Sequence, residues 1–215
     1  ILGGATYPPL VNSSNVFMGT IEECGNIGSW QTLTPLPQSL ALGAAVVVGN
    51  RLYFAGGSTS GQAVFGAKQK VYKADIGLDG TIGAWTEAGL LPDSMIGFGM
   101  VEINNHIVII GGRGLSSGSF ANVRSTEINL DGNLGSWTEL PPLPYPVLRA
   151  SITRAGNTLI SAGGIYGSSY LNLVFSAHIN SDGSISEWST SPNNLPRVNC
   201  CSPLVAWGNR VYLTG

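Results

Sequence analysis

Short apolar runs alternate with turn residues along the chain, and together they predict pairs of β-strands. In the clearest pair, the runs LGAAVVV and RLYFAGG flank the dipeptide Gly49-Asn50. Glycine and asparagine supply the positive φ angles that a two-residue hairpin turn requires. Positions 40–57 are therefore predicted to form a β-hairpin. The same hairpin is predicted three more times, with turns at Asn104-Asn105, Gly156-Asn157 and Gly208-Asn209.

Two further strands are predicted in each unit of the pattern. After a double glycine and a variable polar loop comes a third apolar run, such as Val71 to Ile76 or Val123 to Ile128. A turn, in most units Asp-Gly, then leads into a short fourth strand that carries a tryptophan. A Leu-Pro pair is expected to end each unit, at positions 36–37, 91–92, 143–144 and 195–196.

The unit repeats at roughly 50 residues. The double glycines begin at positions 3, 56, 111 and 163, and tryptophans keep step with them at Trp30, Trp85, Trp137 and Trp188. Four short antiparallel strands cannot cover both faces of their own sheet, so neighbouring units must stack radially. The sequence therefore predicts an all-β fold, a β-propeller of four-stranded antiparallel blades.

The order of double glycine, third strand, tryptophan and Leu-Pro resembles the kelch repeat, over essentially all 215 residues. The resemblance implies a single kelch-like propeller domain over 1–215. Its blade equivalents are about 1–38, 39–92, 93–144 and 145–196, followed by the first two strands of another blade at 197–215. Because the first and last residues occupy the same place in the repeat, we expect a contiguous part of a larger propeller, with a self-closed four-bladed ring as the alternative.

Composition narrows the classes of partner. Hydrophobic residues make up 43% of the chain, enough to fill a core, so disorder is excluded. The net charge of −2 offers no basic field for nucleic acid. No apolar run approaches the ~20 residues of a spanning helix, so membrane insertion is not expected. Low charge, at 10% of residues, and the sequon Asn12-Ser13-Ser14 favour an extracellular or cell-surface location.

Two repeated residue types are interpreted as scaffold. A tryptophan that recurs at one strand position suits packing between blades better than a sugar-stacking or cage role. Asp79, Asp131 and Asp182 each precede a glycine in a short turn, and turn capping explains them better than calcium binding. No cofactor and no metal site is expected.

Binding residues are sought in the loops that differ between blades. By kelch analogy, the loops after the double glycines and after Leu-Pro share one face. That face would carry Lys68, Arg113, Arg149 and Arg197 as ligand contacts, with Lys70 beside them and Asp93 as its one carboxylate. Aromatic rings accompany these cations, and Tyr166 is the ring assigned to the site. The set predicts a protein or glycan ligand of anionic character; scattered solubilising charges are the alternative.

Catalysis has weaker support than recognition. Copper oxidases of the galactose oxidase type resemble this scaffold, but His106 and His178 occupy non-equivalent points. A mutarotase-like sugar enzyme would depend on Asp93 as its acid or base. No hydrolase, Walker or zinc-protease motif is present. We therefore expect a non-catalytic recognition or scaffold module. One alternative is a structural subunit of an extracellular assembly that packs against copies of itself. The other is a sugar enzyme.

The three cysteines are not expected to form a structural framework. Cys24 precedes Trp30 at one end of the predicted disc, whereas Cys200 and Cys201 begin an inner strand at the other end. Neighbouring residues of a strand point to opposite faces, so the adjacent pair is expected to act as small apolar side chains. A strained vicinal disulfide is the alternative.

Overall fold

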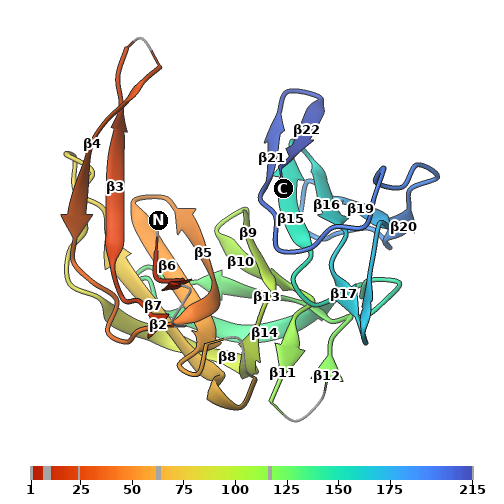
Figure 1. Cartoon of the computed structure of the whole chain (residues 1–215), viewed down its shortest axis with the longest axis horizontal. Helices are drawn as coiled ribbons and strands as arrows, with labels where there is room; N and C mark the ends of the chain where they lie inside the picture. Colours follow the sequence, from red (N-terminus) through yellow and green to blue (C-terminus); the bar gives the residue numbers. More distant parts are fainter. Residues whose placement is uncertain (1, 7–10, 24, 62–63, 116–117, 215) are drawn as a thin grey trace.

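A computed structural model describes residues 2–6, 11–23, 25–61, 64–115 and 118–214. These residues form an all-β fold, with one short 3-10 turn, η1 (Val64–Gly66). Twisted antiparallel sheets stand side by side in an arc (Figure 1), which is the arrangement of blades in a propeller. Within the described residues there is no helix of the length and apolarity needed to cross a bilayer.

Three sheets contain a complete set of four blade strands. The first holds β5 (Ala41–Val48), β6 (Arg51–Ser58), β7 (Lys68–Asp75) and β8 (Thr86–Ile96); the second β9 (Gly99–Ile103), β10 (His106–Ile110), β13 (Val123–Ile128) and β14 (Leu134–Leu140); the third β15 (Ser151–Ala155), β16 (Thr158–Ala162), β19 (Val174–His178) and β20 (Ser189–Thr190). Each strand pairs antiparallel with its neighbour in this order. The predicted four-strand unit is confirmed.

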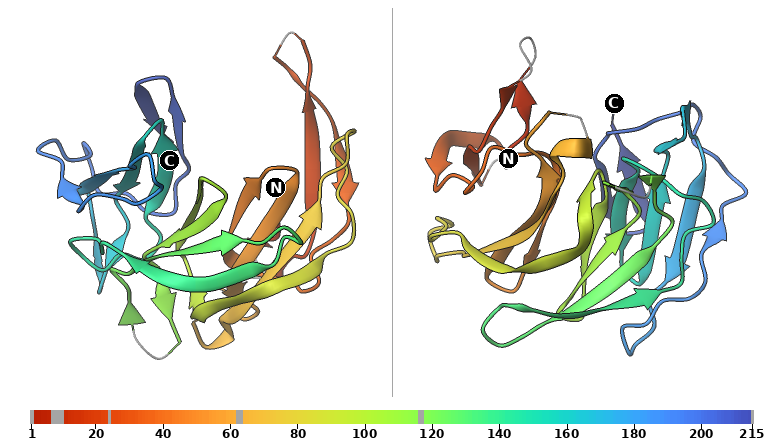
Figure 2. Two further views of the ribbon diagram at one scale, coloured as in Figure 1. Left: turned by 180° about the vertical axis from the view of Figure 1, so that it is seen from behind. Right: turned by 90° about the horizontal axis from the view of Figure 1, so that it is seen from below.

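Two hairpins flank the three blades, and shorter hairpins lie in the loops. At the two ends of the arc lie β3 (Val16–Ile21) with β4 (Ile27–Leu33), and β21 (Leu204–Trp207) with β22 (Arg210–Leu213). Shorter hairpins occupy three of the loops after double glycines: β1 (Ala5–Thr6) with β2 (Val11–Asn12), β11 (Arg113–Gly114) with β12 (Gly118–Ser119), and β17 (Ile165–Tyr166) with β18 (Ser169–Tyr170). Figure 2 shows the sheets and the hairpins at the two ends of the arc from two further sides.

The predicted hairpin turns are present. Gly49, Asn104, Gly156 and Gly208 all have φ between +47° and +58°. The double glycines also have positive φ angles, and a steric contact adds a second requirement for glycine. A Cβ built on Gly3, Gly56, Gly111 or Gly163 would run into a backbone carbonyl of the segment entering the next blade. Glycine therefore recurs there because it alone allows both the φ angle and the close approach of two backbones.

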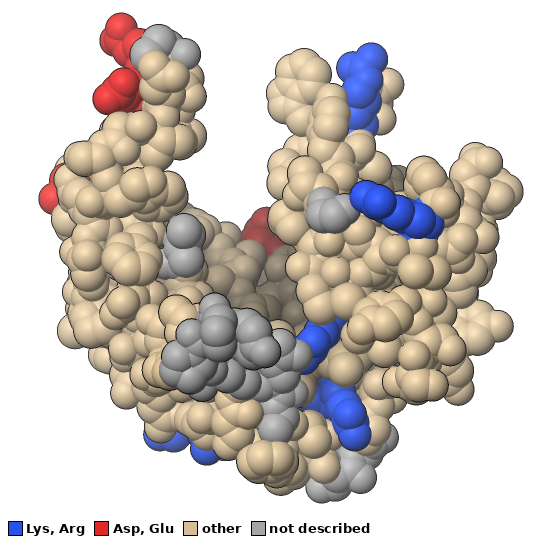
Figure 3. Space-filling model, viewed as in Figure 1, with Lys and Arg blue, Asp and Glu red and all other residues tan. Residues whose placement is uncertain are grey.

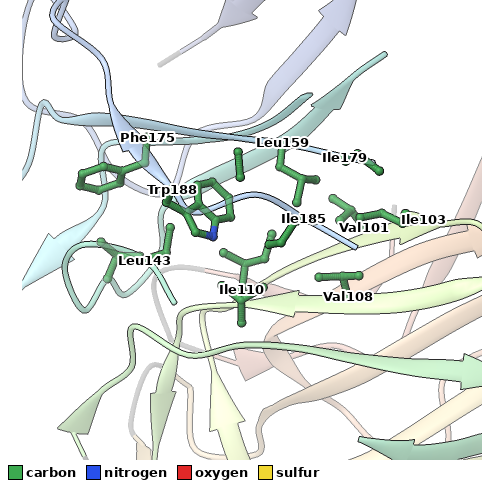
Figure 4. Packing of buried hydrophobic residues seen from close by; sticks show 13 residues of the cluster. Val101, Ile103, Val108, Ile110, Leu143, Leu159, Phe175, Ile179, Ile185 and Trp188 are labelled. Atoms are coloured by element: carbon green, nitrogen blue, oxygen red, sulfur yellow. The ribbon is translucent and has the colours of Figure 1, made fainter. Parts of the chain in front are cut away.

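Buried side chains fill the spaces between blades. One cluster joins Val101, Ile103 and Ile110 of the second blade to Leu159 and Phe175 of the third (Figure 4). Tryptophans link these layers: the indole N–H groups of Trp85, Trp137 and Trp188 donate to carbonyls at the end of the preceding blade over 3.1, 2.8 and 3.0 Å. Trp85, Trp137 and Trp188 thus pack between blades as predicted, whereas Trp30, at one end of the arc, is 57% exposed. Trp85 and Trp188 lie just before β8 and β20, not within the fourth strand as expected.

One predicted boundary is wrong. Leu91-Pro92 was expected to end a blade, but β8 continues through it to Ile96. The pairing of β7 with β8 shifts register between Leu90 and Met95, and the far end of β8 also pairs on its other side with β11, Arg113 lying opposite Ile96. Proline is tolerated because the irregular pairing needs no donor at position 92.

Candidate functional site

Backbone hydrogen bonds gather the variable loops on one face. Gly4 N donates to Leu40 O over 2.9 Å, Gly112 N to Val147 O over 2.7 Å, and Gly164 N to Asn199 O over 2.8 Å. Each bond joins a loop after a double glycine to the segment that enters the next blade. The two sets of loops thus lie together, as the kelch analogy implied, and we call this surface the loop face.

Hairpin β17–β18 separates two hollows of this face. On one side Tyr166 and Gly167 line a hollow of about 260 Å³ together with Arg113 and Ser119. On the other side Tyr170 lines a hollow of about 380 Å³ together with Arg197 and Asn199. Each hollow therefore combines one guanidinium with one tyrosine ring.

The core holds the tyrosine of the first hollow in place. Tyr166 meets the ring of Tyr145 edge to face, with 6.2 Å between centroids. Tyr145 stacks on Phe175 at 6.3 Å, and Phe175 is fully buried. Tyr166 still exposes 48% of its surface. A half-exposed ring on a fixed base presents contact area to a ligand with little loss of rotamer entropy on binding.

Basic side chains on the sheets differ in their ion pairing from Lys68 and Arg113. Arg51, Lys70, Arg124 and Arg154 form ion pairs with carboxylates of the sheets. Lys70, predicted beside the site, is thus held by Glu87 at 2.7 Å. Lys68 and Arg113 form no ion pair with any residue that the structure describes. In Figure 3, atoms of Lys and Arg (blue) also appear on the side of the molecule that faces the viewer, near the hollow in its centre.

The structure brings only part of the predicted set together. Arg113 and Tyr166 share one hollow, and Arg197 lies in the other. Lys68 begins β7 opposite Met95, outside both hollows. Tyr170, another aromatic ring of this face, lines the second hollow, but its place across the hairpin from Tyr166 was not predicted. The spacing of Tyr166 and Tyr170 around Gly167-Ser168, a tight turn with φ of +61° at the glycine, was the signal that could have indicated two rings flanking a hairpin.

Arg149 belongs to a different structural series. Leu42, Gly97, Arg149 and Cys201 occupy the same place in successive repeats, and all have φ between +57° and +63°. Their backbones are joined in sequence: Gly97 N donates to Leu42 O, Arg149 N to Gly97 O and Cys201 N to Arg149 O, over 2.9, 2.7 and 3.1 Å. We call these four the axial residues, because they lie in or beside the innermost strands β5, β9, β15 and β21.

The interpretation of the cysteine pair is wrong. Cys200 and Cys201 precede β21 and are not part of a strand. Because the left-handed backbone at Cys201 turns the chain, the two side chains do not point to opposite faces, and their sulfur atoms lie 3.0 Å apart. Both are free thiols, and Cys201 is exposed. Cys24 lies outside the described residues.

The side chain of Asn12, the asparagine of the sequon, forms a hydrogen bond within the fold. Asn12 Nδ2 donates to Ser58 O over 2.7 Å. This bond uses one of the two hydrogens of the nitrogen, and a glycan would replace the other. The extracellular location stays a prediction.

The aspartates of the repeat cap their turns, as expected. Asp79 accepts from Thr81 N and Oγ1, Asp131 from Asn133 N and Nδ2, and Asp182 from Ser184 N and Oγ, over 2.7 to 3.1 Å. These bonds lower the pKa of all three carboxyls. Across the described ranges, three or more potential ligands from His, Cys, Asp and Glu never cluster as a metal site would require.

Acid should therefore weaken the fold. A carboxyl whose folded pKa lies below its unfolded value stabilises the fold above the unfolded value, about 4, and this contribution is lost as pH falls through the folded pKa. We expect the urea midpoint to fall between about pH 5 and about pH 3. The variant carrying Asp79→Asn, Asp131→Asn and Asp182→Asn should lose part of that dependence. An unchanged pH profile would contradict a role for these caps.

Comparison with known proteins supports the class that the sheets define, a β-propeller of kelch-like repeats. No family model matches the chain. A human protein, Kelch repeat and BTB domain-containing protein 12, is 28% identical over 178 residues, which cover 78% of this chain and 28% of the human protein. Kelch-like protein 40b of Danio rerio is 27% identical over 115 residues, which cover 54% of this chain and 18% of that protein. The chain thus spans less than a third of either relative.

Proposed function

We propose that this chain is a non-catalytic recognition module that binds an acidic segment of a partner protein on its loop face. The observation that carries the proposal is the pair of hollows beside β17–β18, each with one arginine and one tyrosine. Tyrosine and arginine are the residue types most enriched at the energetic centres of protein interfaces. A guanidinium also binds a carboxylate through two parallel hydrogen bonds.

The distribution of carboxylates supports an anionic partner. Asp93 is the only acidic residue in the described loop segments of this face, and its Oδ1 accepts a hydrogen bond from Ser94 N over 2.7 Å. The other carboxylates lie on the sheets or in the opposite turns, where several pair with basic residues. Because like charge is scarce near the hollows, an acidic segment meets little repulsion there.

A peptide-display selection tests this proposal. We expect peptides selected on the wild-type chain to be rich in Asp and Glu and to bind more weakly as salt is raised. Charge reversal by Arg113→Glu and Arg197→Glu together should weaken their binding more than about tenfold. Arg210→Glu is the control for each single reversal, because it makes the same change of −2 in charge on β22, away from both hollows, and should leave affinity nearly unchanged.

Two results would overturn the proposal: selected peptides without acidic residues, or equal binding by the double variant and the control. An acidic sugar presents the same carboxylate chemistry to an arginine and a tyrosine. Binding of an acidic glycan from an array, lost in the same double variant while no peptide is selected, would assign the hollows to a glycan instead of a protein.

A further inference from the structure

The thiols of Cys200 and Cys201 form a pair at the edge of the loop face. Their sulfur atoms are 3.0 Å apart. Cys200 is half-buried and lines the hollow that holds Arg197 and Tyr170, whereas Cys201 is exposed and is the last of the axial residues. The pair is therefore accessible to a small molecule from solvent.

The surroundings give the two sulfurs different roles. Burial and a hydrogen bond with Cys201 raise the pKa of Cys200 to about 11, so Cys200 keeps its proton at neutral pH. Cys201 is exposed, and Arg149 Nη1 lies 3.9 Å from its sulfur. Cys201 is therefore suited to attack first, and Cys200 to act second.

We propose that this pair is a thiol–disulfide exchange site for an anionic small-molecule disulfide, and that exchange closes a vicinal disulfide. Cys201 thiolate attacks one sulfur of the small disulfide, a mixed disulfide forms, and one small thiolate leaves. Cys200 then loses its proton to solvent and attacks the Cys201 sulfur, and the second small thiolate leaves. The protein loses two electrons and two protons, and the small disulfide becomes two thiols. Arg149 and Arg197 supply the positive charge that recruits the anion.

Such a bond would be labile and would reshape its surroundings. Adjacent Cα atoms are at most about 3.8 Å apart, less than the 4.4–6.8 Å usual for disulfides, and strained disulfides are readily reduced. Ring closure also acts on the backbone of Cys201, whose N–H donates to Arg149 O over 3.1 Å. Oxidation would thus alter the last axial contact and the wall of the neighbouring hollow, as a reversible switch does.

The test uses the Cys24→Ser chain, so that only the pair can react. The reduced protein is incubated with oxidised glutathione, free thiols are alkylated, and intact mass and the peptide containing residues 200–201 are measured. We expect a product that lacks two hydrogens, carries no glutathione and is restored by reduced glutathione. Adding Cys200→Ser should trap a stable mixed disulfide on Cys201, whereas adding Cys201→Ser should give little adduct.

A second arm tests the role of charge. Arg149→Asn keeps a residue that tolerates the left-handed backbone but removes the guanidinium. It should slow oxidation by glutathione disulfide several-fold and leave oxidation by uncharged hydroxyethyl disulfide nearly unchanged, with Arg210→Asn as the control. Two free thiols after incubation, a persistent mixed disulfide in the Cys24→Ser chain, or a bond between two chains would overturn the proposal. None of these readouts depends on whether the loop face binds a protein.

Discussion

Replacing Trp188 with alanine should lower the free energy of unfolding by about 3–5 kcal/mol. The indole is 8% exposed and lies in the cluster between the second and third blades, among Leu143, Phe175 and Ile185 (Figure 4). Its removal leaves a cavity and takes the donor away from Pro141 O. Urea denaturation followed by circular dichroism measures the loss.

Trp30→Ala is the matched control for this change. Trp30 holds the same place in its repeat but is 57% exposed, so its removal should cost far less. Trp188→Phe keeps a buried six-membered ring but loses the N–H and the rest of the five-membered ring. Its loss should therefore lie between those of the two alanine variants, with about 1–3 kcal/mol from the unsatisfied carbonyl. Equal losses for Trp188→Ala and Trp30→Ala would show that burial between blades is not what the residue provides.

Substituting alanine for Gly163 should also be severely destabilising, by more than about 2 kcal/mol. Gly163 has φ of +67°, and a Cβ there would lie well inside van der Waals distance of Asn199 O. The new methyl group would separate the third blade from the segment that enters the next one. The bond from Gly164 N to Asn199 O, 2.8 Å long, would be disturbed as well.

Gly156→Ala isolates the effect of φ alone. Gly156 has a similar φ of +57°, but a Cβ there meets nothing within 4 Å. Only backbone strain of about 1–2 kcal/mol is expected. If thermal and urea denaturation gave the same loss for both variants, the contact with Asn199 would not explain the recurrence of the double glycine.

The repeated parts of the molecule were predictable from sequence because the same physical requirement appears in every copy. A Gly-Asn or Asn-Asn pair is required wherever two inner strands turn, and Trp85, Trp137 and Trp188 each donate to the preceding blade. The extension of β8 past Pro92 was not predictable, because it depends on pairing with β11 of the following loop; the equivalent pair in the next repeat, Leu148 opposite Ile165, is only an isolated bridge.

The site was predicted as a set of residue types and not as an arrangement. Arg113 and Arg197 were expected together on one face, but the structure places them in separate hollows, beside Tyr166 and Tyr170, on the two sides of hairpin β17–β18. The cysteine pair was misjudged for a related reason: period-two alternation holds within a strand, and the left-handed φ of Cys201 lies just outside one.

The bonds that fix hairpin β17–β18 to its neighbour are made by backbone atoms. Leu148 and Ile165 exchange N–H to carbonyl bonds of 2.9 and 2.8 Å, and Leu171 N donates to Gly164 O over 2.9 Å. The side chains of positions 166–170 take no part in these bonds. The side chains of 166 and 168–170 could therefore be randomised, with Gly167 kept for its φ of +61°, to vary the proposed binding surface while the anchoring bonds remain, as in an antibody loop on its framework.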